Sequence, residues 1–185
     1  MVIGQFGLMR IISGHMRGLQ LVAPKDLPVR PTTDIAKESL FNILNQRLEF
    51  ANVNGLDLFS GTGNISFELC SRSCKQVTAV DRNSKCCRYI SQIQTKYGLK
   101  QLEIINSDVF DYLELSKGKF DLIFADPPYD MPNLFRLPEL IFKNNLLALE
   151  GIFVLEHPAL VQLNQVVQFK ENRIYGNSAF SFFYL

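Results

Sequence analysis

The sequence has no tryptophan, only two histidines and only four cysteines among its 185 residues. The cysteines form no C-x-x-C pair, and neither His15 nor His157 lies close to them in sequence, so no metal site is expected. They are predicted to be reduced thiols of a cytoplasmic protein: Cys70, Cys74, Cys86 and Cys87. No apolar run approaches a membrane span, and the apolar first eight residues carry no basic segment, so neither a membrane anchor nor a secretory signal is expected.

The formal net charge is only +1, which excludes a polycation. The composition, 47% hydrophobic and 20% charged, is typical of one globular domain with a single well-buried core. The charge is uneven, because residues 1–31 hold four basic residues and one acid, and this segment indicates either a polyanion partner or a solvated face. The basic residues are Arg10, Arg17, Lys25 and Arg30.

From about Asn54 onward, short apolar segments alternate with helix-length segments. Strands are predicted over residues 55–59, 76–81, 102–108, 119–126 and 150–157, and helices over 64–73, 83–97, 109–115 and 133–144. Repeated strand–helix–strand order predicts an α/β fold with a doubly wound, Rossmann-like sheet that is mostly parallel.

The two ends of the chain follow other patterns. Residues 164–176 and 178–185 are two strand candidates joined by a turn, which predicts an antiparallel pair at one edge of the sheet. Residues 10–14 and 19–24 predict a β-hairpin, and residues 27–31 an extended linker fixed by two prolines. A helix is predicted from Thr33 to Leu48, with an apolar face of Ile35, Leu40, Ile43, Leu44 and Leu48.

The loop after the first strand of the parallel sheet reads "DLFSGTGNISFE", from Asp57 to Glu68. Gly61 and Gly63 permit a tight turn and close approach of a ligand to the backbone. The third glycine of a dinucleotide-binding motif would stand at position 66, where the chain has Ser66. An ordinary strand-to-helix turn is therefore an alternative interpretation of this loop taken alone.

Two further acids follow the next two strands. Asp81 could accept hydrogen bonds from a ribose, and Asp108, with the backbone N–H of Val109, could bind an adenine. Each could instead cap a helix, but three such acids beside a glycine turn favour an adenosine site. Because the carboxylate of Asp57 suits a cation better than a pyrophosphate, S-adenosylmethionine is preferred to NAD as the cofactor.

The fourth strand ends in "FADPPYD", where Asp126 is followed by two prolines and Tyr129. The Asp126 carboxylate and the Pro127 carbonyl could accept the protons of an aromatic amine while Tyr129 stacks on its ring, which would prepare the nitrogen to accept a methyl group. The alternative is an aspartate that caps a proline-rich turn.

Together these motifs resemble the RsmD family of 16S rRNA (guanine-N2)-methyltransferases, which are class I enzymes dependent on S-adenosylmethionine. The resemblance starts at Met9 and rests on "MRIISGHMRG", "RPTTDIAKESLFNIL", "LDLFSGTGNISFE", "VTAVDRN", "SDVFDYL", "FADPPY" and "VLEH". It implies a seven-stranded mixed sheet whose last strand is antiparallel. Family members commonly have glycine where this chain has Ser73.

The resemblance also implies the site residues. Catalytic residues would be Asp126, Pro127 and Tyr129, and the cofactor would be held by Asp57, Phe59, Gly61, Thr62, Gly63, Asp81, Arg82, Asp108 and Val109. RNA would meet Arg10, Arg17, Arg30 and Arg72.

The expected organisation is an RNA-facing head over residues 1–32 and a methyltransferase domain over 33–185. Either Met1 or Met9 could be the first residue of the native protein. The expected substrate is 16S rRNA in the small ribosomal subunit or an assembly intermediate, and the protein is expected to be a cytoplasmic monomer. Alternatives are a DNA adenine-N6 or other amino methyltransferase, an NAD-dependent oxidoreductase and a non-catalytic ribosome-assembly factor.

Overall fold

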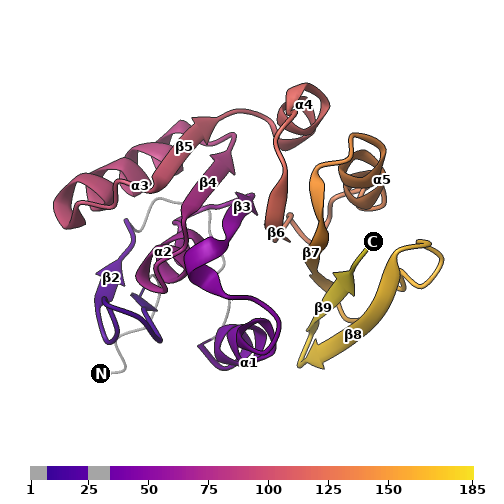
Figure 1. The fold of residues 1–185 in the computed structure, drawn as a ribbon, viewed down its shortest axis with the longest axis horizontal. Helices are drawn as coiled ribbons and strands as arrows, with labels where there is room; N and C mark the ends of the chain where they lie inside the picture. The colour runs from indigo at the N-terminus through magenta and orange to yellow at the C-terminus, as the bar shows by residue number, and fades with distance from the viewer. Residues whose placement is uncertain (1–7, 25–33) are drawn as a thin grey trace.

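A seven-stranded sheet forms the centre of the computed structural model, which describes residues 8–24 and 34–185 (Figure 1). The strand order is β5-β4-β3-β6-β7-β9-β8. The bounds are β3 Asn54–Leu58, β4 Gln76–Asp81, β5 Leu102–Asn106, β6 Phe120–Ala125, β7 Leu147–Pro158, β8 Phe169–Tyr175 and β9 Ser178–Phe183. Strands β3 to β7 pair in parallel, whereas β9 runs antiparallel between β7 and β8. The predicted mixed sheet and its antiparallel last strand are confirmed.

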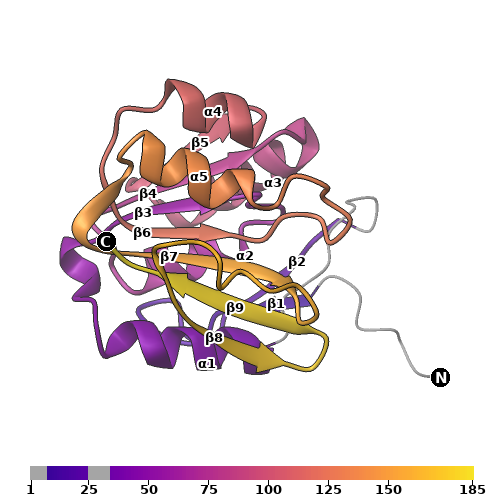
Figure 2. The same ribbon diagram turned by 90° about the vertical axis from the view of Figure 1, so that its right-hand side faces the viewer.

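Helices cover both faces of the sheet (Figure 2). They are α1 Asp34–Asn45, α2 Asn64–Ser71, α3 Ser84–Tyr97, α4 Val109–Leu115 and α5 Arg136–Lys143, with a 3-10 turn, η1, at Phe50–Asn52. One apolar core packs the sheet against α1, α2, α3 and the amino-terminal hairpin, and a second packs it against α4 and α5. Side chains of neighbouring residues in β6 point to opposite faces of the sheet, so Phe124 packs in the first core and Ile123 in the second.

The amino-terminal hairpin consists of β1 Leu8–Arg10 and β2 Gln20–Val22, and the predicted antiparallel pairing is confirmed. The predicted first strand over residues 10–14 is wrong, because β1 ends at Arg10 and the backbone N–H groups of Ile12 and Ser13 donate to Glu68 and not to a strand. Its turn docks on the end of α2, where the His15 N–H donates to the Ser71 carbonyl at 2.9 Å. A side chain at Gly14 would place its Cβ 1.8 Å from that carbonyl oxygen, so only glycine fits this contact. The predicted linker at residues 27–31 and the predicted helix start at Thr33 lie outside the described residues.

Two details of the predicted helices are wrong. Helix α1 ends at Asn45, before Leu48, and Ile35 is 75% exposed, while Ala36 and Lys37 are buried instead. The buried face of α1 is displaced because Lys37 has polar partners inside the protein. Ser73, after α2, is exposed and has φ +65°, a conformation that favours glycine.

Candidate functional site

A cavity of about 540 Å³ lies beyond the carboxyl ends of β3, β4, β5 and β6. The loops that follow these four strands supply nearly all of the side chains that were predicted to form the site. Those that line the cavity are Asp57, Phe59, Gly61, Thr62, Asp81, Arg82, Asp108, Val109, Asp126, Pro127 and Tyr129. The structure therefore brings the candidate cofactor residues and the candidate catalytic residues into one space.

The glycine loop owes its shape to three residues with left-handed backbone, Phe59 (φ +60°), Gly61 (φ +53°) and Gly63 (φ +78°). Gly63 does not line the cavity. A Cβ there would lie 2.9 Å from the ring of Phe67 and 3.1 Å from the side chain of Ile90. Gly63 therefore allows α2 and α3 to pack closely, and it contributes to the site through the turn.

Asp57 forms the buried base of the cavity beside α2. Its Oδ2 accepts hydrogen bonds from the backbone N–H of Ser66, at 3.0 Å, and from the Ser66 hydroxyl. Burial raises the pKa of Asp57 to about 7, although the bonds from Ser66 act in the opposite direction. A cation bound beside Asp57 would favour its ionised form. Ser66, which stands at the position of the third glycine in a dinucleotide-binding motif, therefore orients Asp57 through these hydrogen bonds.

The next two aspartates are fixed by backbone groups. Asp81 accepts from the Gly61 N–H at 2.8 Å through Oδ2 and from the Asn83 N–H at 2.7 Å through Oδ1. Each oxygen keeps a lone pair for a ligand. Asp108 caps α4 by accepting from the Phe110 N–H at 2.8 Å, so the helix-cap interpretation holds for it. Asp108 also lines the cavity, and its contact with an adenine stays a prediction.

The D-P-P-Y loop forms the β6 side of the cavity. Its backbone is anchored where the Asp126 N–H donates to the Leu58 carbonyl at 3.4 Å. Asp126 and Tyr129 are half-buried, Pro127 is buried, and all three line the cavity. All three residues therefore lie in one cavity, as the acceptor and stacking roles require, and those roles stay predictions.

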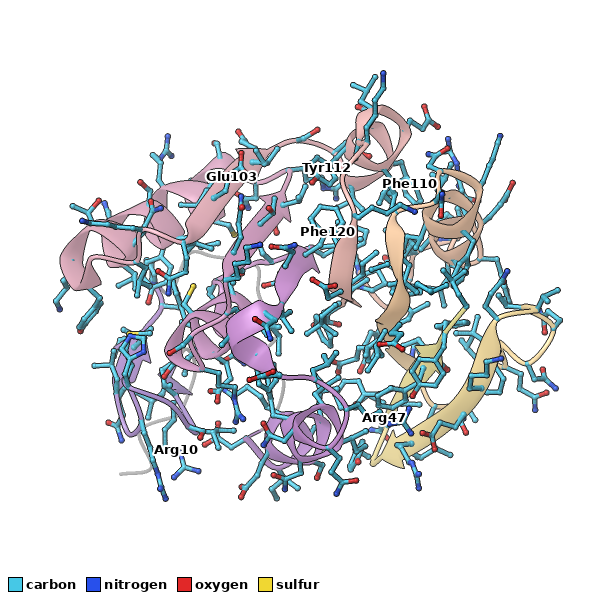
Figure 3. The ribbon with its side chains drawn as sticks, in the orientation of Figure 1. Arg10, Arg47, Glu103, Phe110, Tyr112 and Phe120 are labelled. Atoms are coloured by element: carbon cyan, nitrogen blue, oxygen red, sulfur yellow. The ribbon has the colours of Figure 1, made fainter. Side chains whose placement is uncertain are left out.

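The candidate RNA-binding arginines do not share one environment. Arg10 lies on the opposite side of the molecule from Phe110 (Figure 3) and pairs with Asp34, the first residue of α1, at 3.0 Å. Arg17 is exposed on the hairpin turn, and Arg30 lies outside the described residues. The side chain of Arg72 is only 7% exposed.

Arg72 is directed into the protein. It donates to Glu68 at 2.8 Å and to Asn45 at 3.0 Å, and its guanidinium lies 4.4 Å from the centre of the Phe41 ring. These contacts give Arg72 a structural role that the sequence pattern did not indicate. Its contact with RNA stays a prediction.

Sequence reasoning missed several residues that line the cavity, above all Ser60 and Asn64, which flank the glycine turn. The Ser60 hydroxyl is buried and has no hydrogen-bond partner within the described part of the chain. Buried hydroxyls are normally paired, so this group is suited to a ligand. The G-x-G spacing located the loop but held no signal for these two side chains. Others missed are Ile65, Asn83, Cys86, Phe110, Phe124, Pro128 and Met131.

The described residues, 8–24 and 34–185, hold neither a metal-binding cluster nor a membrane-spanning helix. No group of three or more histidine, cysteine or acidic side chains is arranged to hold a metal ion. No helix in these ranges is long and apolar enough to cross a membrane.

Comparison with known proteins places the chain in a family. It is 35% identical over 163 residues to YlbH of Bacillus subtilis, covering 86% of this chain and 88% of YlbH. It is 32% identical to the "Ribosomal RNA small subunit methyltransferase D" of Haemophilus influenzae, covering 81% of this chain and 79% of that protein. The solved structure of yhhF from Escherichia coli superposes with a TM-score of 0.82 at 26% identity, covering 96% of this chain and 97% of that one. The sequence model described as "Conserved hypothetical protein 95" matches residues 9–184, so the chain belongs to this family, the RsmD family that its motifs predicted.

Proposed function

We propose that the protein transfers a methyl group from S-adenosylmethionine to the exocyclic N2 amine of a guanine in 16S rRNA. The observation that carries the proposal is the single cavity in which three strand-end aspartates and the D-P-P-Y loop meet. The names of relatives from Haemophilus influenzae and Escherichia coli, "Ribosomal RNA small subunit methyltransferase D", support ribosomal RNA as the substrate.

The cavity residues fit this cofactor from one end to the other. Asp108 would meet the adenine, Asp81 the ribose hydroxyls, and the β3 loop the methionine portion, where Asp57 suits the ammonium. The buried, unpaired hydroxyl of Ser60 offers one further donor or acceptor at that end. When bound, S-adenosylmethionine supplies an electrophilic methyl group on its sulfonium.

The residues of the D-P-P-Y loop would prepare the amine. The lone pair of a guanine N2 is delocalised into the ring, so the nitrogen is a poor nucleophile until its protons are drawn to acceptors. The Asp126 carboxylate and the Pro127 carbonyl supply two acceptors, and proline fixes the backbone that carries them. Tyr129 would hold the guanine by stacking on its ring, so that the guanine N2 is directed toward the β3 side of the cavity.

The test is Asp126→Ala, with Asp130→Ala as the matched control in the same loop, because Asp130 is exposed and does not line the cavity. We expect Asp126→Ala to retain cofactor binding and to lose at least about 100-fold in turnover. Asp130→Ala should remain active. Full turnover by Asp126→Ala would refute the assigned role.

The exposed Arg10 and Arg17 of the hairpin support an RNA-facing head. We propose that the protein acts as a cytoplasmic monomer on the small subunit or an assembly intermediate. Labelled cofactor should mark small subunits in preference to naked rRNA, and should leave duplex DNA and protein unmarked. Mass spectrometry of rRNA from a deletion strain should show one missing guanine methyl, and an unchanged pattern would refute the proposed substrate.

A further inference from the structure

Lys37 of α1 is completely buried, which is unusual for lysine. Its ammonium donates to the Arg10 carbonyl at 2.7 Å and to the Asn64 side-chain Oδ1 at 2.8 Å, and it lies 3.6 Å from Glu68 Oε2. An ammonium has three donors, and here three acceptors surround it. Lys37 therefore joins three elements: the hairpin, α1 and the first turn of α2.

Glu68 completes the cluster from α2. Its carboxylate is fully buried and accepts from the backbone N–H groups of Ile12, at 2.8 Å, and Ser13, at 3.0 Å, as well as from Arg72. Both carboxylate oxygens are thus held by fixed groups. These contacts tie Lys37 to the hairpin and to α2, so Lys37 restricts the orientation of the side chain that it contacts at the cavity wall.

That side chain is Asn64, whose amide orientation follows from the chemistry of lysine. An ammonium only donates hydrogen bonds, so the atom that faces Lys37 must be the amide oxygen. The amide nitrogen, with its two donor hydrogens, is then the group left for other partners. Asn64 lines the cavity, and because its oxygen is held by Lys37, a ligand there would meet its amide nitrogen as a donor.

The position of Asn64 indicates which part of the ligand it would meet. Under the proposed function, the adenine lies at β5 and the ribose at β4, so the methionine portion lies at β3, the next strand of the sheet. Asn64 follows the β3 loop directly. The other charges of the cavity wall are mainly carboxylates, namely Asp57, Asp81, Asp108 and Asp126. A ligand carboxylate among them needs nearby donors.

We propose that the Asn64 amide nitrogen donates a hydrogen bond to the carboxylate of S-adenosylmethionine, and that Lys37 is the positioning residue that fixes this orientation. The inference rests on the proposed function and adds to it a contact with the cofactor's carboxylate. The buried Ser60 hydroxyl, in the same loop, is a second neutral donor suited to the same group.

Asn64→Asp tests the contact because it keeps an oxygen for Lys37 and removes the donor. Calorimetry would compare S-adenosylhomocysteine with 5′-methylthioadenosine, which lacks the amino-acid portion, both its carboxylate and its ammonium. Asn64→Asp should weaken S-adenosylhomocysteine about 10- to 100-fold and leave methylthioadenosine unchanged. Asn42→Asp, an exposed change of the same charge on α1, should alter neither affinity.

The outcomes separate the two proposals. Unchanged affinity of Asn64→Asp for S-adenosylhomocysteine, or an equal loss for both ligands, would overturn the carboxylate contact while leaving the proposed function in place. If the wild-type protein binds neither ligand, the proposed function itself fails. Circular dichroism of the variant checks that its fold is retained.

Discussion

Replacing Glu68 by glutamine should lower the free energy of unfolding by about 3–5 kcal/mol, the usual cost of leaving buried charges without their partner. Glu68 is fully buried and lies within 3.6 Å of Lys37 and 2.8 Å of Arg72. Without its charge, two buried cations remain uncompensated. A glutamine amide also brings its own donors against groups that donate to Glu68, including the backbone of Ile12 and Ser13.

Urea unfolding followed by circular dichroism measures the change. Domains of this size have a total stability of about 5–15 kcal/mol, so the expected loss is a large share of it. The midpoint of thermal unfolding should fall by about 6–20 °C. Hydrogen exchange should also show that the amides of Ile12 and Ser13 lose protection, because their acceptor is weakened.

Glu38→Gln is the matched control, because it removes the same charge from an exposed position of α1. It should change the stability by less than about 0.5 kcal/mol. If Glu68→Gln costs no more than Glu38→Gln, the buried carboxylate does not hold the cluster together, and the reasoning fails.

Two further predictions concern single positions. The pKa of Asp57 is raised to about 7 in the folded protein, so the unfolded chain releases this proton at lower pH than the folded protein does. The free energy of unfolding of the wild-type protein should therefore fall as the pH rises from about 4 to about 7, by up to about 1.4 kcal/mol per pH unit. Asp57→Asn should flatten that dependence in urea midpoints measured at pH 5 and pH 8, and identical profiles would contradict the buried-acid description. Ser73 is exposed and has φ +65°, a backbone conformation that is strained for serine and not for glycine. Ser73→Gly should therefore stabilise the protein by about 1 kcal/mol. A thermal midpoint that is unchanged or lower would show that the strain is absent.

The sheet was predictable because each of its strands is a local pattern. Apolar segments of four to eight residues bounded by polar ends predicted β3 to β6 closely, and α4 begins and ends at the predicted residues, Val109 and Leu115. The helix-free tail predicted the antiparallel pair of β8 and β9. The edge of the sheet where the aspartates meet followed from the parallel order alone, since the carboxyl ends of such strands lie together.

What the sequence did not indicate depends on contacts between distant residues. Lys37 reads as a surface residue of an amphipathic helix, and only folding brings it against Arg10, Asn64 and Glu68. Arg72 was expected to meet RNA, and its contacts with Glu68 and the Phe41 ring likewise form only in the folded protein. Charge and periodicity record the type of a side chain, whereas burial of a charge depends on partners that local patterns do not contain.

The attachment of the hairpin to α2 also delays its docking during synthesis of the chain. Its turn is held by Glu68 and Ser71, and the bond from Ile12 to Glu68 spans 56 residues. At a synthesis rate of about 5–20 residues per second, the hairpin therefore exists for roughly 3–11 seconds before its docking partner has been made. The hairpin is synthesised first, but it can dock only after α2, which holds Glu68 and Ser71, has been synthesised.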